Sequence, residues 1–260
     1  MARSHPDAIE KETREKYDGG IYKGEAICAV PKLGARHFAD ILLEIKFSLV
    51  MEHIKDGCSL DLCCGSGLHL LALSDRIKHG VGVDFSKSFI QRANQERKAL
   101  NIENIEFVQS NARLMPFKEE SFGHVYSFSS LYHIPSVGEV INEISRVLKR
   151  GGTCIIELGN LYSLNTLVCK AHPELAYPCH IPVKRMKEAI LKAELKIIRH
   201  RAFQFLPLWA NKPLWLYPVI SPFWNKVMEK KIKGRMIDEY LSNLPLIRFL
   251  AFRHIFVCTK

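Results

Sequence analysis

Two carboxylates and a pair of closely spaced glycines are the residues with the clearest chemical potential in this sequence. Residues 59–70 read SLDLCCGSGLHL, in which Asp61 lies in an apolar run and Gly65 and Gly67 follow. Glycine permits positive φ and lets a ligand approach bare backbone. Leucines then recur at helical spacing, so we predict a buried strand, a tight turn and a helix whose first N–H groups face a ligand. A glycine pair alone is weak evidence, because such turns also serve packing.

The second carboxylate ends the next predicted strand, whose sequence over residues 80–84 is GVGVD. Asp84 lies 17 residues beyond Gly67, and an acid roughly 20 residues after the glycine turn binds ribose hydroxyls in dinucleotide-binding folds. A carboxylate at the end of a strand can accept hydrogen bonds from two vicinal hydroxyls. We therefore predict that Asp84 binds a ribose; the alternative is an acid in a surface turn.

Alternating strands and helices must position these residues. The pattern predicts strands at 59–62, 80–84, 105–108, 124–129 and 153–157, and helices over 34–55, 66–77, 86–99 and 136–149. The last of these helices is expected to be capped by Gly151 and Gly152. Strands that alternate with helices are typical of an α/β, doubly wound, mostly parallel sheet. A further helix (184–193) and strands at 195–199 and 255–258 are expected to complete it.

Length and composition favour one structural domain in three parts. We expect a helical N-terminal arm over 1–55, a ligand-binding core over 56–160, and completion of the sheet with an insertion at about 202–250 within 161–260. Residues 1–20 are charged throughout and lack an apolar stretch, so we do not expect a signal peptide. The sequence has no apolar run of about 18 residues and no C-x-x-C pair among its eight cysteines. These features predict a cytoplasmic protein without a structural metal site.

The positive charge is concentrated in the last third of the chain. Residues 181–260 hold 16 Lys/Arg and 5 Asp/Glu, whereas 1–180 hold 21 and 22, and all three tryptophans fall in the later segment. Aromatic residues beside basic ones fit a membrane interface through 202–235, a lid over an apolar pocket, or nucleic acid. An ordinary charged face is the structural alternative. We favour the lid with peripheral membrane contact, and consider nucleic acid the weaker interpretation.

Five ordered motifs together resemble a class I S-adenosylmethionine-dependent methyltransferase of the ubiquinone and menaquinone biosynthesis type, in the type 11 group. They are LDLCCGSG (60–67), VGVDFS (81–86), NARLMPF (111–117), LYHI (131–134) and ISRVLKRGG (144–152). The resemblance implies a Rossmann-like sheet of seven strands with the last antiparallel, and S-adenosyl-L-methionine as methyl donor. The sequence departs from the family at Cys63, where a glycine is usual, and at Asn111, where an acid is usual.

The resemblance also implies roles for individual residues. Asp61 would lie near the methionine amino group, the backbone at Cys63, Gly65 and Gly67 would approach the cofactor, and Asp84 would bind the ribose. A carboxylate satisfied by turn amides is the alternative for Asp61. The remaining cofactor contacts implied are the adenine face at Phe85, the adenine edge at Asn111 and Ala112, the methionine at Ser129, and closure by Tyr17 and Tyr22 of the N-terminal arm.

The implied reaction is an in-line methyl transfer, which needs a general base only for an acceptor that is protonated at working pH. His133 is the candidate base, with capping of the following helix as an equal alternative. Tyr132, Glu157 and Asn160 are lesser candidates for the acceptor pocket. We predict a small-molecule acceptor, lipophilic or phosphate-bearing. An RNA or protein methyltransferase and a non-catalytic cofactor-binding protein stay open as alternatives, and oligomeric state is not predicted.

Overall fold

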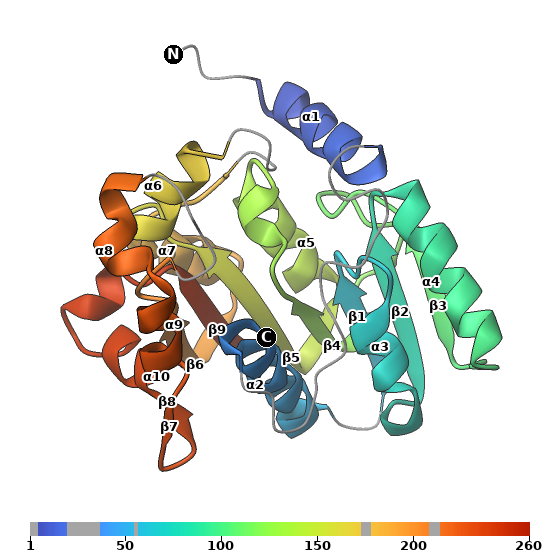
Figure 1. Ribbon diagram of the computed structural model, residues 1–260. Coiled ribbons are helices and arrows are strands. Elements are labelled where there is room, and N and C mark those ends of the chain that lie inside the picture. The colour runs from blue at the N-terminus through green and yellow to red at the C-terminus, as the bar shows by residue number, and fades with distance from the viewer. Residues whose placement is uncertain (1–4, 20–36, 55–56, 173–177, 208–213) are drawn as a thin grey trace.

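Seven strands form one sheet in the order β3-β2-β1-β4-β5-β9-β6 (Figure 1). The computed structural model describes residues 5–19, 37–54, 57–172, 178–207 and 214–260. The strands of the sheet are β1 (Cys58–Leu62), β2 (His79–Asp84), β3 (Ile105–Gln109), β4 (Phe122–Ser127), β5 (Leu148–Gly159), β6 (Lys196–Phe203) and β9 (Arg253–Thr259). This confirms the predicted α/β, mostly parallel, Rossmann-like fold.

Strand direction decides where polar side chains gather. β3, β2, β1, β4 and β5 pair in parallel, so their carboxyl ends share one edge of the sheet. β9 is antiparallel to both β5 and β6, with Gly159 opposite Arg253. The start of β9 therefore lies at the same edge as the carboxyl ends of the parallel strands. A crevice outside this edge is where open α/β sheets bind their ligands.

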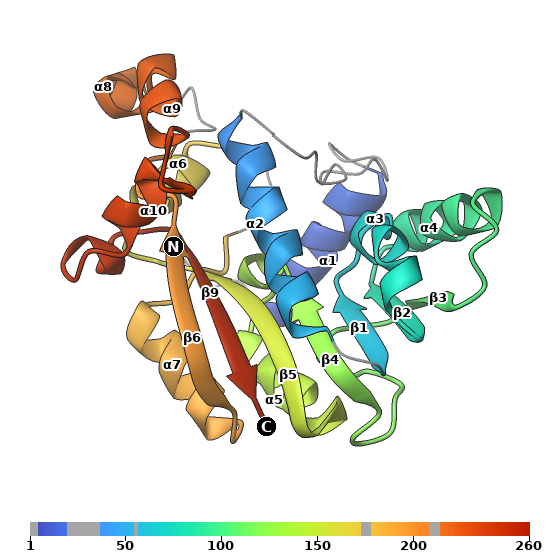
Figure 2. The same cartoon turned by 90° about the horizontal axis from the view of Figure 1, so that it is seen from below.

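Helices cover both faces of the sheet, because its central strands are apolar on both sides. One buried cluster joins α5 (Val137–Val147) and α7 (Val183–Lys192) to one face, and another joins α2 (Phe38–His53), α3 (Leu68–Ala72) and α4 (Lys87–Ala99) to the other. Figure 2 shows α2 in front of the sheet, near β4 and β5. The remaining helices are α1 (Pro6–Asp18), α6 (Leu164–Lys170), α8 (Tyr217–Ile220), α9 (Pro222–Met228) and α10 (Ile237–Ser242), with 3₁₀ turns at Ser74–Arg76, Leu131–His133, Leu214–Leu216 and Ile247–Phe249.

Two predicted helices end earlier than their sequence patterns suggested. The helix expected over 66–77 is α3, five residues long, followed by a 3₁₀ turn. The helix expected over 136–149 ends at Val147, so the predicted cap at Gly151 and Gly152 is wrong. Leu148 already pairs with Phe122 of β4. Gly151, at φ 74°, donates its N–H to Lys260 O, and its left-handed backbone serves this turn within β5.

The 202–250 segment contains only short elements among its described residues. Besides α8, α9 and α10 it holds a hairpin of β7 (Lys231–Ile232) and β8 (Arg235–Met236). Prolines at the starts of α8 and α9 help explain the division, because proline is tolerated in the first turn of a helix and breaks its interior. In the described part of the chain, no helix has the length and apolarity needed to span a membrane.

Candidate functional site

A cavity of about 640 Å³ lies at the carboxyl edge of the sheet. Its walls come from the ends of β1, β2 and β4, from the first half of α2, and from the start of β9. Eight of the predicted site residues lie together in its lining: Tyr17, Asp61, Cys63, Gly65, Asp84, Ser129, Tyr132 and His133. Gly67 lies next to this wall as the N-terminal cap of α3.

The turn after β1 uses the left-handed backbone that its sequence predicted. Cys63, Gly65 and Gly67 have φ values of 62°, 54° and 78°. Cys63 is thus a side chain in a conformation that favours glycine, and this fits its place at a family glycine position. The turn is held by Cys64 N–H donating to Val83 O at 3.0 Å and Gly67 N–H donating to Cys64 O at 2.9 Å.

Asp61 is a buried carboxylate with an unused acceptor atom. Its side chain is only 3% exposed, and Oδ2 has no hydrogen-bond partner among the described residues. Burial raises the pKa of Asp61 well above its usual value, the negative charge of Asp84 raises it further, and the Tyr126 hydroxyl offsets part of the shift. An oxygen left unpaired in a buried site is costly unless a ligand donor meets it. The alternative of a carboxylate satisfied by turn amides does not apply to Oδ2.

Asp84 is held by the glycine turn itself. Gly65 N–H donates to Oδ2 at 2.9 Å and Ser86 N–H donates to Oδ1 at 3.0 Å. Burial raises the pKa of Asp84 to about 6 and the charge of Asp18 adds to the shift, although the amide hydrogen bonds oppose it. Each carboxylate oxygen has further acceptor capacity, since it uses one of its lone-pair positions. The side chain can therefore receive additional donors from a ligand.

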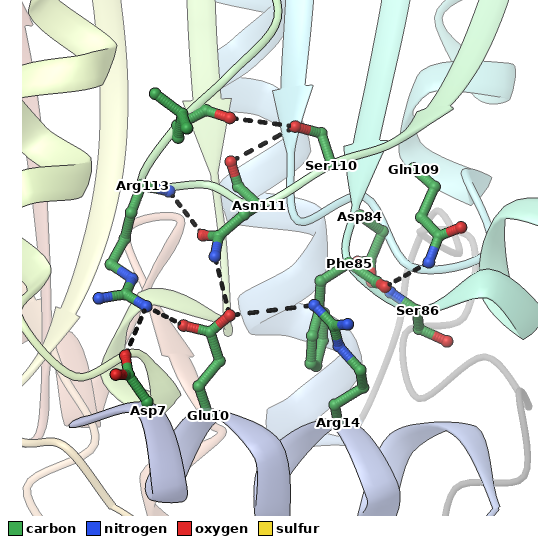
Figure 3. A network of polar contacts seen from close by, with 11 residues as sticks. Asp7, Glu10, Arg14, Asp84, Phe85, Ser86, Gln109, Ser110, Asn111 and Arg113 are labelled. Atoms are coloured by element: carbon green, nitrogen blue, oxygen red, sulfur yellow. Dashed lines mark hydrogen bonds and ion pairs between the residues drawn. The ribbon is translucent and has the colours of Figure 1, made fainter. Parts of the chain in front are cut away.

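Helix α1 covers the adjoining end of the cavity through a network of polar contacts (Figure 3). Asn111 Nδ2 donates to Glu10 Oε1 at 2.8 Å, and Arg113 pairs with Glu10. Arg14 lies over the ring of Phe85, 5.6 Å from its centroid. At the other end of α1, Asp18 accepts hydrogen bonds from the hydroxyls of Ser86 and Ser88. The predicted arm is therefore docked directly against the loops after β2 and β3.

The predicted adenine-contact residues lie beneath this helix. Phe85, Asn111 and Ala112 line a second hollow of about 60 Å³, and it shares Tyr17, Cys63, Asp84 and His133 with the main cavity. Asn111 Oδ1 already accepts the N–H of Arg113 at 2.9 Å, so a ligand donor would share this oxygen. Tyr22, the other tyrosine assigned to closure, falls outside the described residues.

His133 lies where the two hollows meet. It ends the 3₁₀ turn after β4, and its ring centroid is 4.7 Å from that of Tyr132 and 6.5 Å from that of Tyr17. Asn160 is absent from the residues that line the main cavity. Its amide donates to Phe249 O and Ala251 O, which joins the end of β5 to the chain before β9.

A buried ion cluster lies at the far wall of the cavity, and of its three ions sequence reasoning named only Glu157, as a candidate for the acceptor pocket, and missed Lys46 and Arg253. Glu157, fully buried, pairs with Lys46 at 2.7 Å and with Arg253. Lys46 also donates to Ser129 Oγ at 2.8 Å, and Ser129 N–H donates to Glu157 Oε2 at 3.1 Å. The two cations lower the pKa of Glu157 to about 2 despite its burial. The available signal was charge inside apolar runs, since Lys46 interrupts the buried face of α2 and Glu157 that of β5.

The described residues contain no cluster of His, Cys, Asp or Glu suited to a metal ion. The seven free cysteines of this part of the chain include Cys63 and Cys64 beside the cavity. Burial raises the pKa of both thiols, and the nearby carboxylates raise it further, so neither is a thiolate nucleophile at neutral pH.

Comparison with known proteins points to one family. Residues 60–156 match a family model described as a methyltransferase domain. Over 100 residues the chain is 34% identical to a demethylmenaquinone methyltransferase of Oceanobacillus iheyensis, covering 37% of this chain and 42% of that protein. It is 38% identical over 99 residues to the protein of the same name from Lactococcus lactis, covering 37% and 39%. The chain thus matches less than half the length of these curated relatives.

Solved structures share the fold at low sequence identity. Geranyl diphosphate C-methyltransferase from Streptomyces coelicolor, in complex with Mg²⁺, geranyl diphosphate and S-adenosyl-L-homocysteine, superposes with a TM-score of 0.65 at 16% identity, and all of each chain is covered. Phosphoethanolamine N-methyltransferase 2 from Haemonchus contortus, in complex with S-adenosyl-L-methionine, gives a TM-score of 0.65 at 17% identity over 95% of this chain and 60% of that one. The [4+2]-cyclase SpnF gives 0.62 at 15% identity, covering 97% and 92%. The fold is therefore shared by proteins with different named activities, and function must be argued from the site.

Proposed function

Residues 60–156 belong to the methyltransferase domain family, and on that premise we propose that this protein transfers a methyl group from S-adenosylmethionine to a small-molecule acceptor. The observation that carries the proposal is the pair of buried carboxylates at one edge of the sheet. Asp61 has a free acceptor atom, and Asp84 can accept further donors. S-adenosylmethionine has a matching pair of donor groups, an ammonium and a ribose diol, separated by the sulfonium.

The proposed cofactor bed follows from the order of the strands. Asp61 on β1 binds the methionine amino group and Asp84 on β2 binds the ribose hydroxyls, with Phe85, Asn111 and Ala112 around the adenine. Cys63, Gly65 and Gly67 let the turn approach the cofactor, while Ser129 flanks the methionine and Tyr17 closes the bed from α1. All but Gly67 line one or both hollows of the site.

Methyl transfer requires the protein mainly to align the acceptor with the methyl group and to exclude water. The sulfonium supplies an activated methyl group, whose transfer releases a neutral thioether. The chain's own residues then hold the acceptor in line with that methyl group and keep the site dry. His133 is placed to accept a proton from a hydroxyl or carbon acid, because it lines both hollows.

We propose further that the acceptor is lipophilic and bears an anionic group such as phosphate. Apolar side chains and two cations share the cavity wall, which suits a ligand with an apolar body and an anionic end. The apolar residues are Phe38, Leu42, Leu43, Leu68 and Phe128, and the cations are Lys46 and Arg253. A cytoplasmic enzyme that reaches its acceptor at the membrane surface through residues 202–235 fits this chemistry.

Titration calorimetry with S-adenosylhomocysteine tests the cofactor assignment. Asp84 must be ionised to accept two hydroxyl donors, and its pKa is raised from 3.8 to about 6. Roughly one molecule in ten keeps the carboxylate charged at pH 5, so we expect about tenfold weaker binding at pH 5 than at pH 7.5. Asp84→Asn should bind more weakly at pH 7.5 and lose this dependence. Absence of binding by the wild-type protein would refute the proposed function.

A loss of stability through the titration of Asp84 does not confound this measurement. The folded-state pKa is higher than the unfolded value, so the native state binds the extra proton between pH 6 and pH 4. Protonation of Asp84 therefore adds to stability as the pH falls through this window, and the burial penalty of the charged form is present in full only above about pH 6.

The acceptor class is tested by supplying S-adenosylmethionine with a radiolabelled methyl group to fractionated extracts. We expect label in the small-molecule and lipid fractions. Label only in RNA or protein would favour the alternative methyltransferases, and binding without transfer to any fraction would favour a non-catalytic role.

A further inference from the structure

Arg253 presents an unused hydrogen-bonding edge to the cavity. Its Nε donates to Gln204 Oε1 at 2.6 Å, and its Nη1 donates to Tyr132 Oη at 3.0 Å, to Ser129 Oγ at 3.3 Å and to Glu157. Nη2 has no hydrogen-bond partner among the described residues. The side chain is 17% exposed and lines the cavity. The guanidinium is therefore fixed on one side and open on the other.

The supports of Arg253 make this orientation rigid. Gln204 donates from Nε2 to Asn165 Oδ1 at 2.8 Å, and its N–H donates to Asp238 Oδ2 at 2.7 Å. The rings of Tyr132 and Phe252 lie 5.5 and 5.3 Å from the guanidinium carbon. A planar donor group held in one orientation loses little freedom when it binds a ligand, which favours recognition of oxyanions.

The three ions at this wall, Lys46, Arg253 and Glu157, have a net charge of +1. Two cations, Lys46 and Arg253, face one carboxylate, Glu157. His69 nearby is uncharged at neutral pH, because burial lowers its pKa to about 4 and the charge of Lys46 lowers it further. Asp40 and Glu229 also line the cavity, but both are partly exposed, so water and salt screen their charges.

Arg253 lies beyond the methionine end of the cofactor bed, where its Nη1 donates to Ser129 Oγ. β9 lies three strands from β1 in the sheet, which corresponds to roughly 14 Å at about 4.8 Å per strand. Asp84 on β2 is one strand further away. An anion bound at Nη2 therefore lies on the acceptor side of the site.

We infer that Arg253, together with Lys46, is the binding point for an oxyanion, carboxylate or phosphate, of the methyl acceptor. This inference rests on the proposed function and deepens it. Arg253 acts as a specificity-determining residue, since an acceptor without the anion would leave the net positive charge of this wall uncompensated. The methionine carboxylate of the cofactor has the same chemistry and is the competing source.

The test compares two probes with the same hexyl chain, hexyl phosphate and hexan-1-ol, of which only the first carries an anionic group. Both are titrated at pH 7.5 into protein saturated with S-adenosylhomocysteine. We expect the wild-type protein to bind hexyl phosphate at least tenfold more tightly than hexan-1-ol. Arg253→Lys should reduce this preference to below threefold, because the ammonium still pairs with Glu157 but cannot also reach the cavity. Its Kd for S-adenosylhomocysteine should stay within twofold of the wild-type value.

Arg201→Lys is the matched control. Arg201 is also partly buried and ion-paired, with Glu239 at 2.7 Å, but it does not line the cavity. This variant should keep the wild-type preference. Equal binding of the two probes by the wild-type protein would overturn the inference, and this arm requires no variant to fold. A preference that survives in Arg253→Lys would overturn it as well.

The same titrations separate the two sources of the anion. If Arg253→Lys loses affinity for S-adenosylhomocysteine, Arg253 binds the cofactor carboxylate and the assignment to the acceptor fails. If the wild-type protein does not bind S-adenosylhomocysteine at all, the proposed function fails, whatever the probes show.

Discussion

Gly65 and Gly67 are both left-handed, yet a side chain would meet different surroundings at each. A Cβ added at Gly65 has no atom within 4 Å, whereas one added at Gly67 would lie 2.3 Å from Cζ of Phe107. Gly65 is thus required by backbone conformation alone. Gly67 is required by conformation and by the close approach of β3. The distinction cannot be read from the sequence, because Phe107 is 40 residues away.

Alanine substitutions at the two glycines should separate these effects. Gly65→Ala should lower the free energy of unfolding by about 1–2 kcal/mol, the cost of left-handed backbone for a side chain. Gly67→Ala should cost about 1–3 kcal/mol more, from overpacking against Phe107. Urea denaturation of both variants measures the difference. Phe107→Leu should narrow it, and equal losses in the two variants would argue against the clash.

At the scale of elements, α1 is a docked cover that is held by contacts along its length. Glu10 joins it to the loop after β3 through Asn111 and Arg113, and Asp18 joins it to the start of α4. α1 contributes little to the hydrophobic core, since Thr13 is its only buried residue. Cofactor binding should therefore depend on α1 more than global stability does.

Glu10→Ala should weaken binding of S-adenosylhomocysteine about fivefold, because the docking contact is worth on the order of 1 kcal/mol at partial exposure. The free energy of unfolding should change by less than about 1 kcal/mol. Glu12→Ala is the control on the same helix, since Glu12 is 53% exposed and pairs only along the helix, with Lys16. Calorimetry on both variants checks the expectation; unchanged binding in Glu10→Ala would show that α1 is not a cover.

The sequence named more residues of the proposed cofactor bed than of the proposed acceptor wall, for a physical reason. Asp61, the glycines and Asp84 lie at or just after the carboxyl ends of successive strands, so their spacing along the chain encodes their proximity. Lys46, Glu157 and Arg253 come from α2, β5 and β9, and only the folded sheet brings them together. The end of α5 was mispredicted because Leu148 continues an apolar helical pattern but pairs with β4 instead.

Considered as a whole, the molecule carries an apolar and basic patch near its cavity. The patch, which we call the rim patch, includes Leu214, Trp215 and Phe223, exposed by 79%, 70% and 64%. Exposed lysines follow on α9 and the β7–β8 hairpin at Lys226, Lys230, Lys231 and Lys233. α8 and α9 stand clear of the sheet (Figure 2), and Asn225 and Glu229 beside them line the cavity. This combination suits the surface of an anionic membrane.

We expect the protein to sediment with vesicles that contain phosphatidylglycerol and far less with phosphatidylcholine alone. Trp215→Ser/Phe223→Ser should weaken partitioning by roughly tenfold or more, since each lost aromatic group forfeits its apolar burial. Leu114→Ser/Leu191→Ser is the control, because these leucines are 77% and 62% exposed on other elements. Equal sedimentation of the two double variants with these vesicles would contradict the proposed membrane contact.

The insertion of β9 between β5 and β6 determines the order in which the protein can assemble. Strands β1 to β5 find their partners within residues 58–159, through short crossovers. β6 pairs with β9 alone, so it has no partner in the sheet until residues 253–259 have been synthesised. The half of the molecule that holds Asp61 and Asp84 can thus become ordered in the nascent chain before Arg253 has been synthesised. We expect the nascent protein to acquire its bed for the donor before its capacity to select an acceptor.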